Sequence, residues 1–315
     1  MTNSIFFELE QILGKNRVEI NKNIFQYISL RTTTIAEYFF EANTKDDLQN
    51  ARKITNKLKI PFILLGGGTN LAILHSQLKG LVVKNSYINK EIIEETNKTI
   101  TLLVSSGYPV SKLVQESVES GMEGLEYHKG LPGSVGGAVA MNSKWTKHYS
   151  YFSDTLFFAY IMDDLGNIRK VDKSYFQFAY DYSIVQNTKE VIIDVAFKCN
   201  KMNSDVLIKR AKETQEYRSY TQPHGNATCG CFFKNISKKD QERLRLPTTS
   251  AGYLIDQSGL KNFQIGNFSV SEIHANFIIN KGDGHLKDLV QLINIIKIKV
   301  KDKFGVELEE EVKII

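Results

Sequence analysis

The pattern of hydrophobic and polar positions predicts alternating strands and helices near the N-terminus. One face of a helix is predicted by four positions at helical spacing, Leu48, Ala51, Thr55 and Leu58. Thr44 precedes this helix at the position of an N-cap. The apolar runs 61–65 and 80–83 have the length of short buried strands. Their order predicts a small α/β unit.

The same analysis predicts elements over the rest of the chain. We expect helices at 5–13, 110–118, 204–217 and 250–258, and strands within 30–40, 99–106, 157–170, 190–199 and 275–280. A final helix is predicted by the spacing of Leu286, Leu289, Val290, Ile293 and Val300. Gly121 and Gly305 stand where a glycine ends a helix. We expect a loop between the first helix and residue 25. A composition shift at 221–226 marks our preferred domain boundary.

Three consecutive glycines follow the strand predicted at 61–65. The segment reads Leu64-Leu65-Gly66-Gly67-Gly68-Thr69-Asn70. Because glycine lacks a Cβ, the backbone can turn sharply there and bring successive N–H groups up to an anion. A tight turn between two strands is the alternative. Neither the G-x-G-x-x-G fingerprint nor the Lys-Ser/Thr of a P-loop is present, so we predict anion binding of a different kind from a Rossmann fold.

A second glycine-rich segment occupies 124–139. It contains Gly130-Leu131-Pro132-Gly133-Ser134-Val135-Gly136-Gly137. We expect no regular helix over this segment, because glycine and proline both disfavour one. We expect instead that the backbone closely approaches a flat or anionic ligand. A purely structural loop is the alternative.

Composition and charge restrict the possible classes of protein. The 315 residues leave room for two or three domains, and 42% hydrophobic with 24% charged residues is typical of a globular protein. A net charge of +5 suits a phosphorylated small ligand and is too weak to indicate nucleic acid. No apolar run approaches the roughly 18 residues that would span a membrane, and no signal-peptide layout is present. Three cysteines make no disulfide framework, and we assign no metal site. We expect a cytoplasmic protein.

Seven motifs occur in a fixed order along the chain. They are LLGGGTNL (64–71), GLEYHKGLPGSVGGAVAMN (124–142), FAYDYSI (178–184), GCFFKN (230–235), AGYLIDQSGLKNFQIG (251–266), SEIHANFIIN (271–280) and LEEEV (308–312). Together they resemble the UDP-N-acetylenolpyruvoylglucosamine reductase family, the flavoenzymes that complete UDP-N-acetylmuramate synthesis for peptidoglycan. The resemblance extends from about residue 27 to the C-terminus.

The resemblance implies an α+β fold in two parts. A two-lobed FAD-binding domain of the vanillyl-alcohol-oxidase type precedes a C-terminal α+β substrate-binding domain. The implied bounds are 1–86 and 87–205 for the two lobes and 206–305 for the substrate domain, with a strand in 306–315 able to pack back on the first lobe. The resemblance also implies a monomer with FAD as cofactor, NADPH as hydride donor and a UDP-sugar as substrate.

The resemblance also assigns binding residues. The implied cofactor-binding residues are Leu65, Gly66, Gly67, Gly68, Thr69, Asn70, Gly130, Pro132, Gly133, Ser134, Gly136 and Gly137. The implied substrate-binding residues are Tyr180, Ser183, Arg218, Lys234, Asn235 and Gln257. By this resemblance 66–70 hold the FAD pyrophosphate and 130–139 run along the flavin.

Two catalytic positions keep the chemistry of the family. Cys231 stands where relatives carry a serine or cysteine that donates a proton to the substrate. A thiol is largely protonated at neutral pH and can do this, whereas a buried, inert cysteine is the alternative. Glu311 stands where the family places a carboxylate near the C-terminus. Only the resemblance distinguishes it from an ordinary solvated acidic edge.

The third catalytic position departs from the family. The motif Y-R-x-S, whose arginine meets the substrate carboxylate, reads Tyr180-Asp181-Tyr182-Ser183 here. Asp181 cannot supply a cationic, fork-shaped donor and would repel a carboxylate. The family's small residues after Met-Asn are replaced by Ser143-Lys144-Trp145-Thr146, and a phosphate-binding lysine is absent after Arg218.

These departures leave three hypotheses open. The chain is the reductase, with Asp181 compensated by a cation such as Arg218 or Lys234. Alternatively, it is a flavoprotein paralogue that keeps FAD and has an altered substrate or lost activity. The third possibility is a non-enzymatic protein that binds a nucleotide-sugar or FAD. Four retained positions favour the first hypothesis, namely Cys231, Asn235, Gln257 and Glu311.

Overall fold

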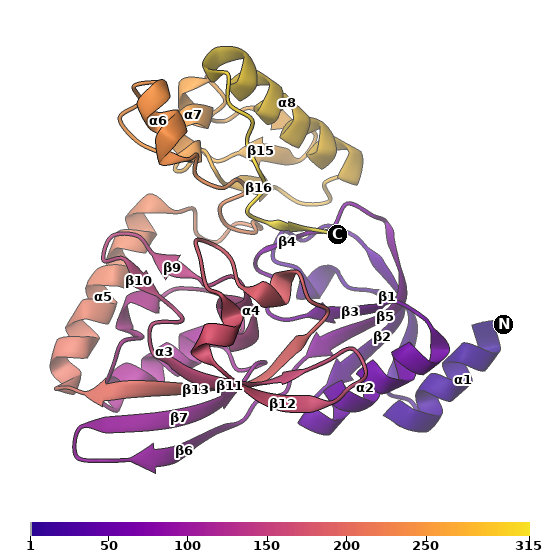
Figure 1. Ribbon diagram of the computed structural model, residues 1–315. Coiled ribbons are helices and arrows are strands. Elements are labelled where there is room, and N and C mark those ends of the chain that lie inside the picture. Colours follow the sequence, from indigo (N-terminus) through magenta and orange to yellow (C-terminus); the bar gives the residue numbers. More distant parts are fainter. Residues whose placement is uncertain (1) are drawn as a thin grey trace. The chain divides into compact units, whose positions relative to one another are not determined.

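The computed structural model describes residues 2–315, which form two compact units (Figure 1). The first unit extends to Lys22 and includes Ala36–Gly67 and Lys79–Arg218. The second comprises Asn23–Ile35, Gly68–Leu78 and Ser219–Ile315. The chain therefore passes between the units several times before its C-terminal part, and we describe each unit by itself.

The first unit begins with two helices and a four-stranded sheet. Its elements are α1 (Thr2–Leu13), β1 (Val18–Asn23), β2 (Ile35–Ala42), α2 (Lys45–Leu58), β3 (Phe62–Leu65) and β5 (Gln77–Asn85). The strand order is β1-β2-β5-β3, and β3 runs parallel to β5 with Phe62 opposite Leu81. Leu9 and Leu48 of the helices share one buried core with Phe40 of β2. The predicted α/β unit is therefore confirmed.

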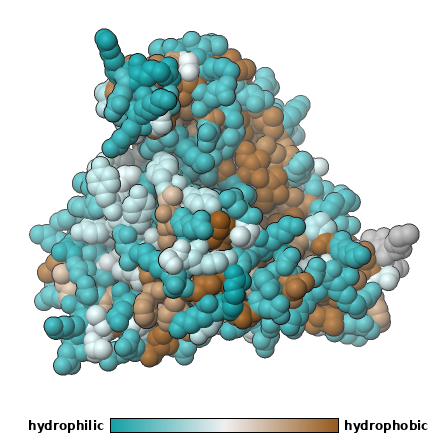
Figure 2. Space-filling model, in the orientation of Figure 1, coloured by the Kyte–Doolittle hydropathy of each residue, from teal (hydrophilic) through white to brown (hydrophobic). Residues whose placement is uncertain are grey.

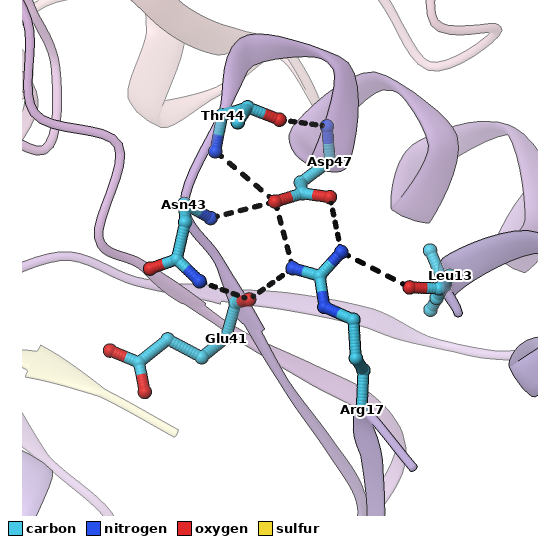
Figure 3. A network of polar contacts seen from close by, with 6 residues as sticks. All are labelled: Leu13, Arg17, Glu41, Asn43, Thr44 and Asp47. Atoms are coloured by element: carbon cyan, nitrogen blue, oxygen red, sulfur yellow. Dashed lines mark hydrogen bonds and ion pairs between the residues drawn. The ribbon is translucent and has the colours of Figure 1, made fainter. Parts of the chain in front are cut away.

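The start of α2 carries the cap that the sequence predicts (Figure 3). The Thr44 side chain accepts a hydrogen bond from Asp47 N, and the Asp47 carboxylate accepts one from Thr44 N, which completes a capping box. The same carboxylate holds both ends of the Arg17 guanidinium at 2.8 and 2.9 Å. Arg17 also donates to the carbonyls of Leu13 and Glu41. The network therefore ties the end of α1 to the start of α2.

A second, antiparallel sheet follows in the same unit. Its elements are β6 (Lys90–Glu95), β7 (Thr99–Ser105), α3 (Val110–Glu119), β8 (Met122–Glu123), α4 (Val135–Ala140), β11 (Leu156–Met162), β12 (Ile168–Asp172), β13 (Val191–Lys201) and α5 (Ser204–Thr221). The strand order is β12-β11-β13-β7-β6, and β8 pairs with the end of β13. Leu113 of α3 and Leu207 of α5 belong to the same buried cluster as Leu102 and Phe197 of the sheet.

Short elements complete the first unit. The strands β9 (Lys144–Trp145) and β10 (Ser150–Tyr151) form an antiparallel pair of their own. Short 3₁₀ turns lie at Glu126–His128, Lys173–Phe176 and Ile184–Gln186, and a further one lies in the second unit at Phe25–Tyr27. Gly121 has φ +67° and follows Ser120, the C-cap of α3, as expected for a glycine that ends a helix.

The second unit is smaller and combines short strands with helices. Its elements are β4 (Leu71–Ala72), α6 (Lys238–Arg243), α7 (Ala251–Gln257), β14 (Gln264–Ile265), β15 (Phe268–Val270), β16 (Ile278–Asn280), α8 (Leu286–Phe304) and β17 (Lys313–Ile314). An antiparallel sheet β14-β15-β16 packs against α8, which Gly305 ends in the left-handed conformation. The C-terminal strand β17 pairs in parallel with β4. Asn280 Nδ2 donates to the carbonyls of Leu30 and Arg31.

Two sequence-based expectations about secondary structure are wrong. The loop expected before residue 25 contains β1, an edge strand in which Val18 is the only buried residue. Such a strand lacks the hydrophobic alternation that identifies strands. The glycine-rich segment expected to have no regular helix contains α4, which includes Gly136 and Gly137. Packing of this turn against the sheet outweighs the low helix propensity of glycine.

Hydrophilic residues cover most of the face seen in Figure 2. Among residues 2–315, no helix has both the length and the apolar composition required to cross a membrane.

Candidate active site

The first glycine segment leaves the end of β3, where Leu65 is buried. A Cβ on Gly66 would lie 2.6 Å from Ser134 Oγ, and one on Gly67 would lie 2.4 Å from Gly133 Cα. Real Cβ atoms essentially never make contacts this short, so a Cβ at Gly66 would displace the Ser134 hydroxyl, and a Cβ at Gly67 would meet main chain that cannot turn away. Glycine at 67 is therefore required for the packing of the two glycine segments against each other. The structure thus brings together the two segments that the sequence singles out. It also changes the reason for Gly67, which we had expected to make room for a ligand.

The carbonyl and amide groups of 66–70 differ in their hydrogen bonding. The carbonyl of Gly66 accepts a hydrogen bond from Lys84 Nζ at 2.7 Å, and the carbonyls of Gly68 and Asn70 accept backbone hydrogen bonds. Within the described chain, the amide N–H groups of 66–70 donate no hydrogen bond to protein atoms. Burial lowers the pKa of Lys84. The Lys84 side chain places its Nζ at this turn. Amide donors and a neighbouring cation fit a phosphate-bearing group such as the FAD pyrophosphate.

The second glycine segment turns directly into α4. Gly130 and Gly133 have φ values of +83° and +104°, which L-residues rarely adopt. Ser134 caps α4 by accepting a hydrogen bond from Gly137 N. Gly136 N donates to Ser106 O at 2.8 Å, and a Cβ at Gly136 would lie 2.8 Å from Ser106 Cβ. Glycine is therefore required at 136, because α4 packs too closely on Ser106, the residue after β7, to leave room for a Cβ.

Other members of this segment face outward. Pro132 and Gly137 are exposed, and a Cβ on Gly137 would meet only Ser134 Oγ, at an ordinary 3.5 Å. These two positions leave room above the segment for a flat ligand. This arrangement fits the isoalloxazine side of FAD.

The turn that carries Asp181 is closed by two backbone hydrogen bonds between Ala179 and Tyr182. Asp181 is buried and has φ +49°, a conformation that aspartate tolerates better than most residues. Its carboxylate lies 3.3 Å from Lys144 Nζ. The sequence analysis named Arg218 and Lys234 as candidate compensating cations, and the structure places Lys144 beside Asp181.

This turn is anchored on the C-terminal end of α4. The carbonyl of Ala140 accepts hydrogen bonds from Ser183 Oγ at 2.6 Å and from Gln186 Nε2 at 2.8 Å. Asn142 Nδ2 donates to Ala179 O at 2.9 Å. Ser183, expected to bind substrate, therefore also fixes the turn that presents Tyr180 and Asp181. Tyr180 itself is 40% exposed.

Arg218 is buried near the end of α5, beside the second glycine segment. Its guanidinium carbon lies 4.2 Å from the centroid of the Trp145 ring, and a Cβ on Gly130 would lie 3.1 Å from Arg218 Cδ. His128 is completely buried nearby; burial and the Arg218 charge lower the pKa of His128 to about 3. Arg218 is thus held between Trp145 and the loop.

Within the second unit, backbone pairing holds the segments of Cys231 and Glu311 together. Cys231 bridges to Phe277, and Phe232 N donates to Asn276 O at 2.7 Å. On the other side, Glu311 N donates to Phe232 O at 2.9 Å. Phe232 and Phe233 are fully buried, which fixes this segment. The half-buried Cys231 and Glu311 therefore extend from two adjacent, rigidly paired segments.

Three further predicted substrate residues, Lys234, Asn235 and Gln257, also belong to the second unit. Lys234 Nζ lies 3.5 Å from Glu309 Oε2 at an exposed position. Asn235 Oδ1 accepts a hydrogen bond from Ala251 N, at the start of α7. Gln257 is exposed at the last position of α7. No group of three His, Cys, Asp or Glu side chains that could hold a metal ion occurs in residues 2–315.

Sequence reasoning missed the roles of Lys144, Trp145 and His128. The first two stood in the sequence only as departures from the family pattern. The available signal was the gain of a cation at 144 together with the loss of one at 181. That signal has meaning only when the two positions are known to be neighbours.

Two family models and several relatives match this chain. Residues 222–315 match the family described as "UDP-N-acetylenolpyruvoylglucosamine reductase, C-terminal domain", and residues 36–172 match "FAD binding domain". The chain is 32% identical to the UDP-N-acetylenolpyruvoylglucosamine reductase of Clostridium novyi, over 98% of this chain and 95% of that protein. It is 30% identical to the reductase of the same name from Caldanaerobacter subterraneus, over 98% of this chain and 97% of that protein.

A solved structure agrees with these sequence matches. The UDP-N-acetylenolpyruvylglucosamine reductase of Thermus caldophilus superimposes with a TM-score of 0.76 and 28% identity, over 95% of this chain and 98% of that one. The predicted α+β fold, an FAD-binding domain followed by a C-terminal α+β domain, is confirmed.

Proposed function

The chain belongs to the UDP-N-acetylenolpyruvoylglucosamine reductase family, and from this we propose which of its residues carry out the family's reaction. The reaction is the FAD-dependent, NADPH-using reduction of UDP-N-acetylglucosamine enolpyruvate to UDP-N-acetylmuramate, a step of peptidoglycan precursor synthesis. The alternatives of a paralogue and of a non-enzymatic binder are not favoured, because identity extends over nearly the whole chain.

FAD, when bound, carries a hydride from NADPH to the enolpyruvyl group of the substrate. We assign its pyrophosphate to 66–70, where amide donors and Lys84 are available. We assign the flavin ring to the exposed side of 130–137, above Pro132 and Gly137. The packing of Gly67 on Gly133 holds the first-unit parts of these segments in register.

Cys231 is the proposed proton donor in the second half of the reaction. Its thiol gives a proton to the substrate carbon next to the one that receives the hydride, and the thiolate that remains takes a proton from water before the next turnover. The observation that carries this assignment is the buried pairing of 231–234 with 276–277 and 309–311, which supports a half-exposed cysteine on a rigid segment. A fixed donor lowers the barrier because it needs no reorganisation during reaction.

The other proposed roles concern binding. Glu311 is the carboxylate partner at the reacting group. The UDP-sugar contacts Tyr180, Ser183, Arg218, Lys234, Asn235 and Gln257. Arg218 carries a permanent charge that suits phosphate oxygens. Asn235 and Lys234 directly follow the rigid segment of Cys231, so they occupy fixed positions relative to it.

We further propose that the protein acts in the cytoplasm as a monomer. NADPH and UDP-sugars are its small-molecule partners, and we assign it no nucleic-acid or membrane partner. The three-part division 1–86, 87–205 and 206–305 also remains a proposal.

The test is NADPH oxidation by purified, FAD-loaded protein. Oxidation should depend on UDP-N-acetylglucosamine enolpyruvate and should form UDP-N-acetylmuramate in equal amount. UDP-N-acetylglucosamine, which lacks the enolpyruvyl group, is the control and should support none. NADPH oxidation of the same rate with and without the substrate, or without formation of the product, would contradict the proposed function.

A further inference from the structure

We propose that Lys144 supplies the cationic contact to the substrate carboxylate that the family's arginine supplies from the position of Asp181. In this proposal Asp181 is a positioning residue for Lys144. The proposal rests on the proposed function, because the carboxylate belongs to the enolpyruvyl group of that substrate. It explains two departures from the family pattern by a single exchange of charge between neighbouring positions.

The geometry of the pair defines where the cation lies. Lys144 Nζ is 3.3 Å from one carboxylate oxygen of Asp181 and 3.5 Å from the other. The two side chains are 13% and 6% exposed, so the pair is largely removed from water. The same Nζ lies 2.8 Å from the centroid of the Tyr180 ring, whose face attracts a cation. Two residues of one turn therefore hold the ammonium group in place.

The backbone of the turn suits a short polar side chain at position 181. Asp181 has φ +49°, in the left-handed region that short polar residues tolerate best. A short carboxylate fits this buried position and points at Lys144. Lys144 stands on the hairpin of β9 and β10, where Tyr151 is its partner across the pair. The charged group thus reaches the turn from a neighbouring hairpin.

The location of the pair relative to the second glycine segment fits contact with the substrate. Lys144 follows α4, and Ser183 and Gln186 anchor the turn of Asp181 on the carbonyl of Ala140 at the end of α4. The six residues of α4 span about 9 Å. At the other end of α4 lies Ser134, in the segment assigned to the flavin. The length of α4 thus separates the turn that contacts Lys144 from the segment assigned to the flavin.

The chemistry of an ammonium group allows both contacts at once. Lysine has three N–H donors, so Nζ can hold the carboxylate of Asp181 and that of the substrate together. The pair is neutral overall, whereas the family's arginine adds a full positive charge. Binding of the carboxylate must therefore depend on the direct N–H contact, which makes Lys144 sensitive to substitution.

The first test compares two ligands on the FAD-loaded protein. UDP-N-acetylglucosamine enolpyruvate carries the carboxylate, whereas UDP-N-acetylglucosamine does not. Lys144→Met should weaken binding of the first ligand about tenfold to a hundredfold, the usual size of a charged hydrogen bond, and leave binding of the second unchanged. Lys144→Arg should keep the preference for the first ligand. Equal affinity changes for both ligands would overturn the proposal.

A matched control is available in the same hairpin region. Lys147 Nζ lies 4.4 Å from the centroid of the Tyr217 ring, so it is also a lysine above a tyrosine. It is exposed, and Lys147→Met should leave both affinities unchanged. A loss of ligand preference in this variant as large as in Lys144→Met would assign the effect to the general charge of the region and overturn the proposal.

The second test places the family's cation at position 181 and removes the cation at position 144. Asp181→Arg alone should lower kcat/KM, because it faces Lys144 with a like charge in a buried site. The double variant Lys144→Ala/Asp181→Arg should recover at least tenfold relative to Asp181→Arg, because it restores the family arrangement. Failure of the double variant to exceed the single one, with FAD bound in both, would contradict the exchange.

Failure of the proposal and failure of the proposed function give different results. If unmodified protein does not reduce the enolpyruvyl substrate, the proposed function is wrong. If it does so and Lys144→Met keeps normal affinity for that substrate, only the role of Lys144 is wrong.

Discussion

The backbone of Gly67 packs directly on the backbone of Gly133, so that a Cβ on Gly67 would lie 2.4 Å from Gly133 Cα and 2.9 Å from its carbonyl carbon. No side chain can move aside here, because both surfaces are main chain. The contact joins the two glycine segments that we assign to FAD. Glycine at 67 is therefore a requirement of the folded chain before any cofactor binds.

Substitution at two glycines separates packing from ligand approach. Gly67→Ala should destabilise the FAD-free protein by about 1–3 kcal/mol, as expected for overpacking, and should also abolish FAD binding. Gly137→Ala lies in α4 with an open Cβ position and should leave the stability of the FAD-free protein equal or up to about 1 kcal/mol higher. It should still weaken FAD binding, because its methyl group would lie on the flavin side. Denaturant unfolding and FAD titration of both variants check this, and identical behaviour of the two would contradict the account.

The Arg17–Asp47 network at the start of α2 predicts an acid-sensitive contribution to stability (Figure 3). Burial disfavours ionisation of Asp47, but hydrogen bonds from Arg17, Asn43 and Thr44 outweigh burial and hold the pKa of Asp47 below its usual value. The stabilisation is therefore complete above that usual value and is lost as pH falls through the lowered pKa of the folded state.

Asp47→Asn should accordingly lower the free energy of unfolding by about 1–2 kcal/mol at pH 7, and by much less near pH 3. The measurement is denaturant unfolding at both pH values. Asp46→Asn is the matched control, since Asp46 is exposed in the same helical turn and should lose only a few tenths of a kcal/mol. An equal effect of the two substitutions would show that the network has no special role.

His128 predicts a second pH dependence, which arises from a buried base instead of a paired acid. Its pKa is lowered to about 3 by complete burial and by the Arg218 charge, so the folded state keeps the ring neutral where the unfolded chain binds a proton. Between pH 6.5 and 3 the unfolded state binds more protons, and stability falls as pH falls, by at most about 1.4 kcal/mol per pH unit from this group.

His128→Asn should therefore flatten the dependence of the unfolding free energy on pH between pH 6 and 4. It should also lower stability at pH 7, because the ring packs edge-on against Phe152 at 5.2 Å. His285→Gln, at an exposed position before α8, should leave the slope as in the unmodified protein. An unchanged slope in His128→Asn would contradict the buried neutral state.

Local signals explain which parts of the fold could be predicted. The start of α2 is predictable because Thr44 and Asp47 cap it within four residues, and the end of α8 because Gly305 adopts φ +66°. The strand β1 escapes prediction because it is an exposed edge whose pairing with β2 supplies its stability. The helix α4 is not predicted from local sequence, because Gly136 is held in it by close packing against Ser106, a residue distant in sequence.

The residues of the site also differ in whether the sequence alone identifies them. Motifs identify Cys231 and Glu311, but only the fold shows that backbone pairing through Phe232 joins their segments. Lys144 could not be assigned from the sequence, because its role depends on a partner 37 residues away. Single residues with a family precedent are visible in a sequence, whereas a pair that exchanges charge becomes visible only in three dimensions.

The role of Cys231 is tested most directly by rapid-mixing measurement of the two half-reactions in Cys231→Ala. Reduction of the bound flavin by NADPH should keep its normal rate, whereas its reoxidation by UDP-N-acetylglucosamine enolpyruvate should slow about a hundredfold to ten-thousandfold, the usual contribution of a general acid. Cys231→Ser should be the mildest change, and Cys229→Ala, at a buried cysteine two residues away, should leave both rates near normal. Equal slowing of both half-reactions in Cys231→Ala would contradict the account.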